Sequence, residues 1–259
     1  MDSALDALLK SQPTLWRGSD RYNDDESIST GFSTLDQALP ARGWCIGGVT
    51  ELLSAHQGIG ELSLLLPALY KVTSEGQWAA FINPPYIPYA PALGNAGIRL
   101  DRLLIVDSRD DANTLWAAEQ VLRSGLFASV VAWVNRSSAQ QQRRLQLAAE
   151  SGKTWATVYR PWHTAKEHSP VAARVRLSVV DARLQLDIFK LRGGSPGHVV
   201  IEPAEFDASQ GAEWPIPAPA AEFSPEAHSE ADSRNRLQNI ARDRSRVRSQ
   251  TRTHTRPGS

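Results

Sequence analysis

The stretch Gly48-Val-Thr-Glu-Leu-Leu-Ser-Ala-His-Gln-Gly-Ile-Gly-Glu-Leu-Ser-Leu-Leu-Leu66 decides the fold class of this chain. It predicts an apolar strand, then a loop that contains glycines, then the start of an apolar helix. This is the layout of a phosphate-binding loop, in which backbone N–H groups and a helix N-terminus surround the phosphates. We therefore expect an α/β domain of the nucleotide-hydrolase type around this stretch.

The same stretch lacks the residues that nucleotide chemistry needs. A working loop ends in Gly-Lys-Ser or Gly-Lys-Thr, whereas Glu61 and Leu62 follow Gly60 here. A carboxylate in place of the lysine repels phosphates by about 1 kcal/mol per close charge pair in water, and leucine has no hydroxyl group for Mg²⁺. We expect a degenerate loop at Gly58, Gly60, Glu61 and Leu62 that binds no cofactor and serves as a scaffold.

Composition and termini limit the class of protein further. The chain has 259 residues, 41% of them hydrophobic, and a net charge of zero, which indicates one domain of about 200 residues with tails. The lone Cys45 excludes a disulfide framework and a cysteine-built zinc site, and favours the reducing cytoplasm. Residues 1–10 do not resemble a secretory signal, and no apolar run approaches the roughly 20 residues of a membrane span.

Local composition divides the chain into three parts. Residues 1–27 predict an N-terminal helix and linker, in which the helix either packs on its own domain or serves as a partner-binding arm. Residues 28–207 form the predicted core. Residues 208–259 are a proline-rich linker and an arginine-rich tail, which we expect to be disordered because few apolar residues offset the entropy of ordering.

Two longer runs resemble a known superfamily. Residues 29–53, STGFSTLDQALPARGWCIGGVTELL, are similar to the entry of the RecA core, and residues 47–69, GGVTELLSAHQGIGELSLLLPAL, most resemble the ImuA group of RecA-like proteins, which are related to the SulA cell-division inhibitors. The resemblance covers about residues 28–202. It implies a RecA-like P-loop NTPase core with a degenerate nucleotide site, a mostly parallel sheet flanked by helices, and C-terminal antiparallel strands.

The resemblance also locates two further losses. The apolar run Gln77–Ile82 predicts a buried strand, and Pro85 follows it where an active relative carries the base that activates water. On the predicted strand at residues 129–134, Trp133 takes the place of the acid that orients the water bound to Mg²⁺. We therefore expect no catalytic residues and no enzymatic activity.

Several polar and aromatic segments leave alternatives open. The loop from Asn83 to Tyr89 is rich in proline and tyrosine, and it is either a packed loop or a binding surface. The acidic run 107–111 fits helix capping better than metal binding. His163 and His168 have no third ligand nearby in the sequence, so we predict no metal site.

Nucleic-acid contacts are predicted in two places. Arg160, Trp162 and Lys166 suit phosphate contact and base stacking in a polar loop, although an ordinary solvated loop fits as well. The tail has the composition of a polyanion-binding segment, with a merely solubilising role as the alternative. Its arginines are Arg234, Arg236, Arg242, Arg244, Arg246, Arg248, Arg252 and Arg256.

The resemblance to ImuA implies a non-catalytic accessory protein in damage-induced translesion DNA synthesis. Its partners would be a Y-family-like, polymerase-inactive protein and an error-prone replicative-type polymerase, with RecA as a further candidate and DNA as a ligand. It would lie in the cytoplasm, associated with the nucleoid, and would not contact membranes. The alternative is a SulA-like cell-division inhibitor that binds the tubulin-like protein FtsZ.

Overall fold

The computed structural model describes residues 27–108, 110–181 and 183–201. The strands are β1 (Ser27–Ile28), β2 (Trp44–Cys45), β3 (Val49–Ser54), β4 (Trp78–Ile82), β5 (Leu103–Val106), β6 (Phe127–Trp133), β7 (Trp155–Pro161), β8 (Ala173–Val180), β9 (Arg183–Leu191) and β10 (Gly197–Ile201). The helices are α2 (Ser33–Ala38), α3 (Leu66–Ser74), α4 (Ala90–Asn95), α5 (Asp111–Arg123) and α6 (Ala139–Gly152), with short 3₁₀ turns η2 (Ser63–Leu65), η3 (Leu100–Arg102) and η4 (Trp162–Lys166). The predicted N-terminal helix and tail lie outside the described residues.

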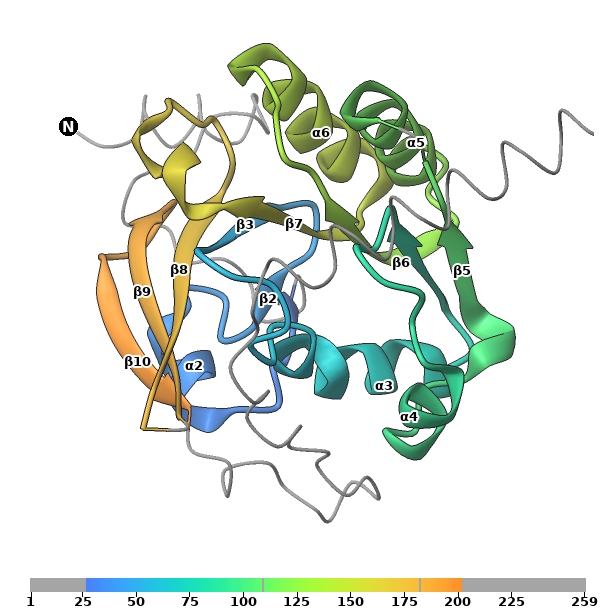
Figure 1. The fold of residues 1–259 in the computed structure, drawn as a ribbon. Coiled ribbons are helices and arrows are strands. Elements are labelled where there is room, and N and C mark those ends of the chain that lie inside the picture. Colours follow the sequence, from blue (N-terminus) through green and yellow to red (C-terminus); the bar gives the residue numbers. More distant parts are fainter. Residues whose placement is uncertain (1–26, 109, 182, 202–259) are drawn as a thin grey trace, which may run out of the picture. The chain divides into compact units, whose positions relative to one another are not determined.

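Eight strands form one mixed sheet in the order β10-β9-β8-β3-β7-β6-β4-β5 (Figure 1). The strands from β8 to β5 are parallel to their neighbours, while β8, β9 and β10 pair antiparallel. Strand β3 lies between β7 and β8, and it is buried along almost its whole length. Strands β1 and β2 form a separate antiparallel pair. Among the described strands, β5 and β10 are therefore the two edges of the sheet.

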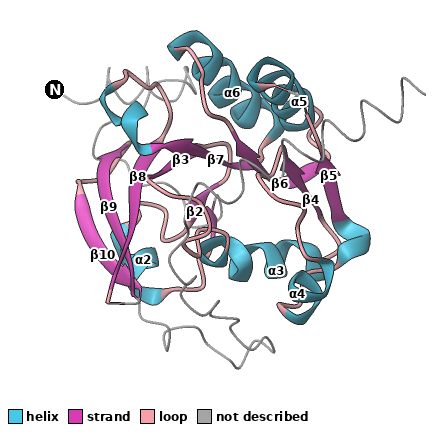
Figure 2. Cartoon of the chain, viewed as in Figure 1, coloured by secondary structure: helices cyan, strands magenta, loops and turns pink. Residues whose placement is uncertain are grey.

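Helices lie on both faces of the sheet (Figure 2), and the side chains of the central strands alternate between two apolar layers. Phe81, Trp133 and Tyr159 belong to the layer that contains α2, α3 and α4. Their neighbours on the same strands, such as Ala80 and Val158, belong to the layer under α5 and α6. This period-two alternation on strands buried on both faces is what a parallel sheet covered by helices requires.

Helices α5 and α6 lie side by side on one face of the sheet (Figure 1), and their ends meet closely. Gly152, the last residue of α6, has no room for a side chain, because an added Cβ would lie 1.9 Å from the carbonyl oxygen of Leu122. We expect Gly152→Ala to lower the free energy of unfolding by about 1–3 kcal/mol, as overpacking does. Urea unfolding monitored by circular dichroism measures this loss.

Gly94 in α4 provides the matched control for that prediction. An added Cβ at Gly94 meets no atom within 4 Å, and alanine is the better helix former by about 1 kcal/mol. Gly94→Ala should therefore leave the protein equally or more stable. Equal destabilisation by both substitutions would contradict the packing seen at Gly152.

The loop after β3 does not have the shape that the sequence predicts. The helix that the sequence predicts after the glycines begins late, because a 3₁₀ turn covers Ser63–Leu65 and α3 begins only at Leu66, with Pro67 in its first turn. Four residues with bend or turn geometry separate Gly58 from Ser63. No α-helix N-terminus therefore follows Gly60 directly, and the dipole and free N–H groups of such a terminus are not available to a phosphate at this point.

Candidate protein-binding surface

The loop after β3 is closed by its own acidic side chain. Gly58 and Gly60 both adopt positive φ angles, of 75° and 88°. The Gly58 N–H donates a hydrogen bond to Oε1 of Glu61 at 3.0 Å, and Glu61 is buried. Leu62 packs against the core. A carboxylate of the chain itself thus takes the backbone donor that an external anion would need.

An aromatic stack fills the space beside this loop. The ring of Trp133 stacks on Tyr159 with centroids 5.2 Å apart, and Phe81 meets Trp133 edge-on at 5.7 Å. The Tyr159 hydroxyl donates to the backbone oxygen of Glu61 at 2.5 Å. Trp133 is therefore a packing residue of the core, and its role here is to support the loop after β3.

Because Tyr159 is buried, its titration makes the free energy of unfolding depend on pH in the alkaline range. Burial, followed by the charge of Glu61, raises the pKa of Tyr159 well above its ordinary value of 10.0. The folded protein keeps this proton when the unfolded chain loses it, so the stabilisation is complete below pH 10.0 and declines as the pH rises through the folded pKa.

Tyr159→Phe removes this titration and one hydrogen bond. We expect the variant to be less stable at neutral pH by about 0.5–1.5 kcal/mol, and its stability to fall less steeply above pH 10 than that of the wild type. Urea unfolding at pH 7, pH 9 and pH 11 gives both quantities. An identical decline in the two proteins would show that Tyr159 ionises freely in the fold.

Arg160 lies in a buried ionic cluster and does not face solvent. Its guanidinium Nη1 is 3.1 Å from Oε1 of Glu51, and its Nη2 is 2.8 Å from Oε2 of Glu167. Glu51 also accepts from Nε of Arg174 at 2.7 Å, and the side chains of Glu51, Arg160 and Arg174 are all at most 5% exposed. The structure contradicts the prediction that Arg160 contacts nucleic acid, because its charge is enclosed and paired.

The ionic cluster holds the turn η4 in place. The guanidinium of Arg174 donates to the backbone oxygens of Thr164, Ala165 and Glu167 at 2.9–3.0 Å. Lys190 lies nearby, and burial followed by the charge of Arg174 lowers the pKa of Lys190. Because Glu51 is on β3 and Arg174 on β8, the cluster fastens a loop at the carboxyl end of β7 to two neighbouring strands.

Of the other predicted nucleic-acid residues, the structure describes Trp162 and Lys166. Trp162 is partly buried, with Arg176 over its ring at 4.5 Å and Phe189 against its edge at 6.0 Å. Lys166 is exposed. The arginines of the tail, from Arg234 to Arg256, lie outside the described residues, and their polyanion binding stays a prediction. Among the described residues, no group of three or more His, Cys, Asp or Glu side chains is placed to hold a metal ion.

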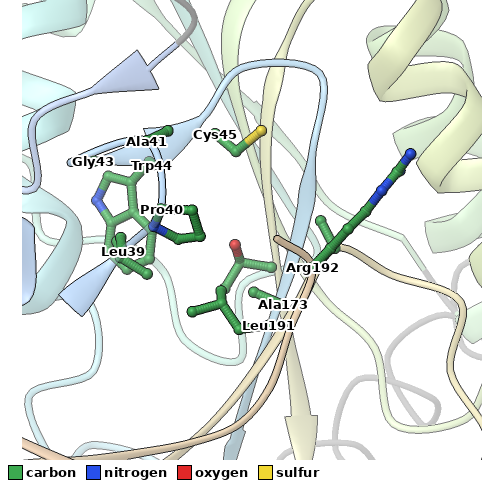
Figure 3. A pocket seen from close by; sticks show the side chains of 11 residues that line it. Leu39, Pro40, Ala41, Gly43, Trp44, Cys45, Ala173, Leu191 and Arg192 are labelled. Carbon is green, nitrogen blue, oxygen red and sulfur yellow. The ribbon is translucent and has the colours of Figure 1, made fainter. Parts of the chain in front are cut away.

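One small apolar cavity lies between the turn after α2 and strands β8 and β9 (Figure 3). Its volume of about 30 Å³ leaves room for little more than a water molecule. Figure 3 shows Leu191 and Ala173 on one side, Trp44 and Pro40 on the other, and the Arg192 side chain directed away from the cavity. This cavity is too small to hold a substrate, and it lies apart from the loops at the carboxyl ends of the strands.

Exposed apolar side chains lie in the loop that follows β4 and on the edge strand β5. In the loop from Asn83 to Tyr89, Tyr86 is 59% exposed, Ile87 is 96% exposed and Tyr89 is 72% exposed. On β5, Leu104 and Ile105 are 37% and 45% exposed. We call these five residues the β5-edge surface. The two segments meet where the Asn83 N–H donates to the backbone oxygen of Val106 at 2.7 Å.

The chemistry of the β5-edge surface is that of a protein-binding surface. Tyrosine is enriched among the residues that anchor partners in interfaces, and the buried core of an interface is apolar. Residues 103–106 contain no proline, glycine or charge, the features by which proteins usually protect an open sheet edge. Of the two meanings left open for the loop at residues 83–89, these exposures favour a binding surface. Pro85 is exposed within this loop.

Sequence patterns could not identify the β5 part of this surface. Leu103–Val106 is an apolar run that predicts a strand, but only the strand order places it at the edge of the sheet. An apolar strand at an interior position would have the same sequence. The sequence feature that could have indicated an edge strand is the short length of this run, since edge strands are often short.

The fold and this surface together define an α/β domain suited to binding another protein. The family described as "Cell division inhibitor SulA" matches residues 47–156. SulA of Edwardsiella piscicida is 30% identical over 117 residues, which cover 44% of this chain and 68% of that protein. SulA of Photorhabdus laumondii is 30% identical over 111 residues, covering 43% of this chain and 63% of the relative, and SulA of Pectobacterium carotovorum is 26% identical over 138 residues, covering 52% and 82%.

The chain belongs to the SulA family of cell-division inhibitors. A solved structure of SulA from Pseudomonas aeruginosa is 28% identical and covers 43% of this chain and 97% of its own, but its TM-score of 0.38 is too low to support an argument about the fold. The matched segment runs from just before β3 to the first residues of β7 and contains the whole β5-edge surface.

These findings correct the predictions drawn from the ImuA resemblance. Assignment to ImuA is wrong, as are the RecA-like P-loop NTPase core and the role in translesion synthesis, because the family and relatives found are SulA. The fold is SulA-like with a mixed sheet. The polymerase partners have no support. Members of the family are named as inhibitors, which agrees with the prediction that the chain is no enzyme, but derivation from an ATPase is unsupported.

The prediction that the chain contains no membrane span can be compared with the structure only for the described residues. Within the described ranges, none of the helices combines the length and apolar character needed to cross a bilayer.

Proposed function

We propose that this chain inhibits cell division by binding FtsZ, the tubulin-like division protein, and that it does so in the cytoplasm. The observation that carries the proposal is membership of the SulA family across residues 47–156. The relatives are named cell-division inhibitors. An inhibitor of this kind needs a surface for a protein partner and no catalytic site.

The β5-edge surface is the part of the described chain that suits this contact best. It lies inside the segment shared with the relatives. Its tyrosines and aliphatic side chains are exposed at the end of the sheet, where no described strand pairs with β5 on its outer side. A partner that covers these side chains gains apolar burial worth about 25 cal/mol per Å² of area removed from water.

The experiment that tests the proposal is FtsZ sedimentation in the presence of GTP. We expect the full chain to reduce the amount of pelleted FtsZ in proportion to its concentration, up to equal amounts of the two proteins. Size-exclusion chromatography of the mixture should then show a complex. Undiminished pellets together with separate elution of the two proteins would contradict the proposed function.

A further inference from the structure

A polar cleft lies apart from the β5-edge surface, between the first turn of α6 and the turn η4. Its volume is about 350 Å³, within the range of small-ligand sites. The lining residues are Asn135, Arg136, Ser137, Ser138, Gln141, His163, Thr164 and Glu167. They come from the segments that follow β6 and β7, so the cleft lies beyond the carboxyl ends of two adjacent parallel strands, where α/β sheets bind their ligands.

The side chains of the cleft offer many donors. Within residues 27–108, 110–181 and 183–201, the guanidinium of Arg136 forms no ion pair, and Arg136 is exposed. In the capping box of α6, Ser138 Oγ and Gln141 Oε1 act as acceptors from backbone N–H groups. The hydroxyl hydrogen of Ser138 and the amide hydrogens of Gln141 therefore remain available to a ligand.

The acids near the cleft are already engaged. Oε2 of Glu167 is bound by Nη2 of Arg160 at 2.8 Å. Asp111 accepts from the backbone N–H groups of Asn135 and Arg136 at 2.9 and 3.1 Å. Behind Glu167, the Arg160 side chain is fully buried, and its Nε has no hydrogen-bond partner among the described residues. Arg160 is enclosed in the ionic cluster and does not line the cleft, so a ligand in the cleft would meet Arg136 as its cationic side chain.

We propose that this cleft binds a phosphate-type oxyanion, with Arg136 as its main charged contact and the hydroxyls of Ser137 and Ser138 as further donors. Arginine and hydroxyl donors in one small space match the several acceptor oxygens of a phosphate group. The same chemistry serves a phosphorylated side chain of a protein and a small phosphate ester. This site is independent of the proposed binding of FtsZ.

The test is a titration of the ¹⁵N-labelled full chain with inorganic phosphate, followed by amide chemical shifts. We expect saturable shifts at Ser137, Ser138 and Gln141, and at least about 10-fold weaker binding by Arg136→Ala. Arg143→Ala is the matched control, because Arg143 is an exposed arginine of α6 that does not line the cleft, and it should bind within about 2-fold of the wild type. Wild-type dispersion of the Arg136→Ala spectrum establishes that the variant is folded.

Two results would overturn the proposal. One is equal shifts when chloride replaces phosphate at the same ionic strength, and the other is equal phosphate affinity of Arg136→Ala and the wild type. A phosphoserine peptide and a nucleoside monophosphate then separate the sources of the phosphate. Tighter binding of the peptide than of inorganic phosphate assigns the site to a phosphoprotein, and tighter binding of the nucleotide assigns it to a small molecule.

Discussion

Glu51→Ala is expected to lower the free energy of unfolding by about 3–5 kcal/mol, the usual cost of removing one partner from a buried ion pair. Glu51 is the only carboxylate in the described chain that joins Arg160 to Arg174, and its side chain is 1% exposed. Without it, two buried guanidinium groups lose their shared counter-charge. Because a domain of this kind is stable by only about 5–15 kcal/mol, the variant should lose between about a fifth and all of its stability.

Thermal and urea unfolding of three variants measures this effect. Glu51→Gln keeps one of the two acceptor oxygens but loses the other and the charge, and it should fall between the wild type and Glu51→Ala. Asp101→Asn is the control at an exposed pair, since Asp101 lies 2.7 Å from Arg99 on the surface, and it should show no measurable change. Wild-type stability of Glu51→Ala would show that the ionic cluster contributes nothing to the fold.

Ile105→Lys should weaken the binding of FtsZ by at least about 30-fold, the loss typical of an interface anchor. The substitution places a charge in the middle of the apolar edge strand β5, and an ammonium group pointing from an edge also opposes added strands. Because Ile105 is already 45% exposed, the free protein should stay folded. Tyr89→Ala should act in the same direction through the loop part of the surface.

Leu147→Lys is the matched control for this prediction. Leu147 is 49% exposed, close to the value of Ile105, but it lies on α6, outside the β5-edge surface. The affinity of Leu147→Lys for FtsZ should equal that of the wild type. Comparable losses in both lysine variants would indicate a general effect of the added charge and would exclude β5 as the contact.

Much of the local structure could be predicted from the sequence. The apolar run at Val49 predicts a strand at residues 49–53, and β3 covers Val49–Ser54. The alternating pattern from residue 173 predicts a hairpin, and β8 and β9 form it. Both predictions depend on hydrophobic period and turn chemistry, which are properties of a few neighbouring residues.

Contacts between distant residues could not be predicted in the same way. Arg160 follows an apolar strand and precedes a polar loop, so its sequence context suggests exposure. It is buried because Glu51, 109 positions earlier, accepts its hydrogen bond from the adjacent strand. Likewise, Trp133 has a structural role that depends on Tyr159 of the neighbouring strand. The sequence around each residue contains no record of these partners.

The assignment to a fold family illustrates a different limit of prediction from the sequence. An apolar strand, a loop with glycines and an apolar helix are compatible with several α/β families, and the layout alone does not separate them. In the structure, Glu61 turns back onto the Gly58 N–H and α3 starts at Leu66. Those details, and the SulA matches, show that the resemblance to a nucleotide-binding loop was one of layout and not of site.

Hydrogen–deuterium exchange of the full chain with and without FtsZ tests the central claim most directly. The account predicts slower exchange in the peptides that contain residues 83–90 and 103–107 when FtsZ is present, and unchanged exchange in α6 at Leu147. Protection confined to other parts of the chain, or no protection at saturating FtsZ, would contradict the claim that the chain binds FtsZ through the β5-edge surface.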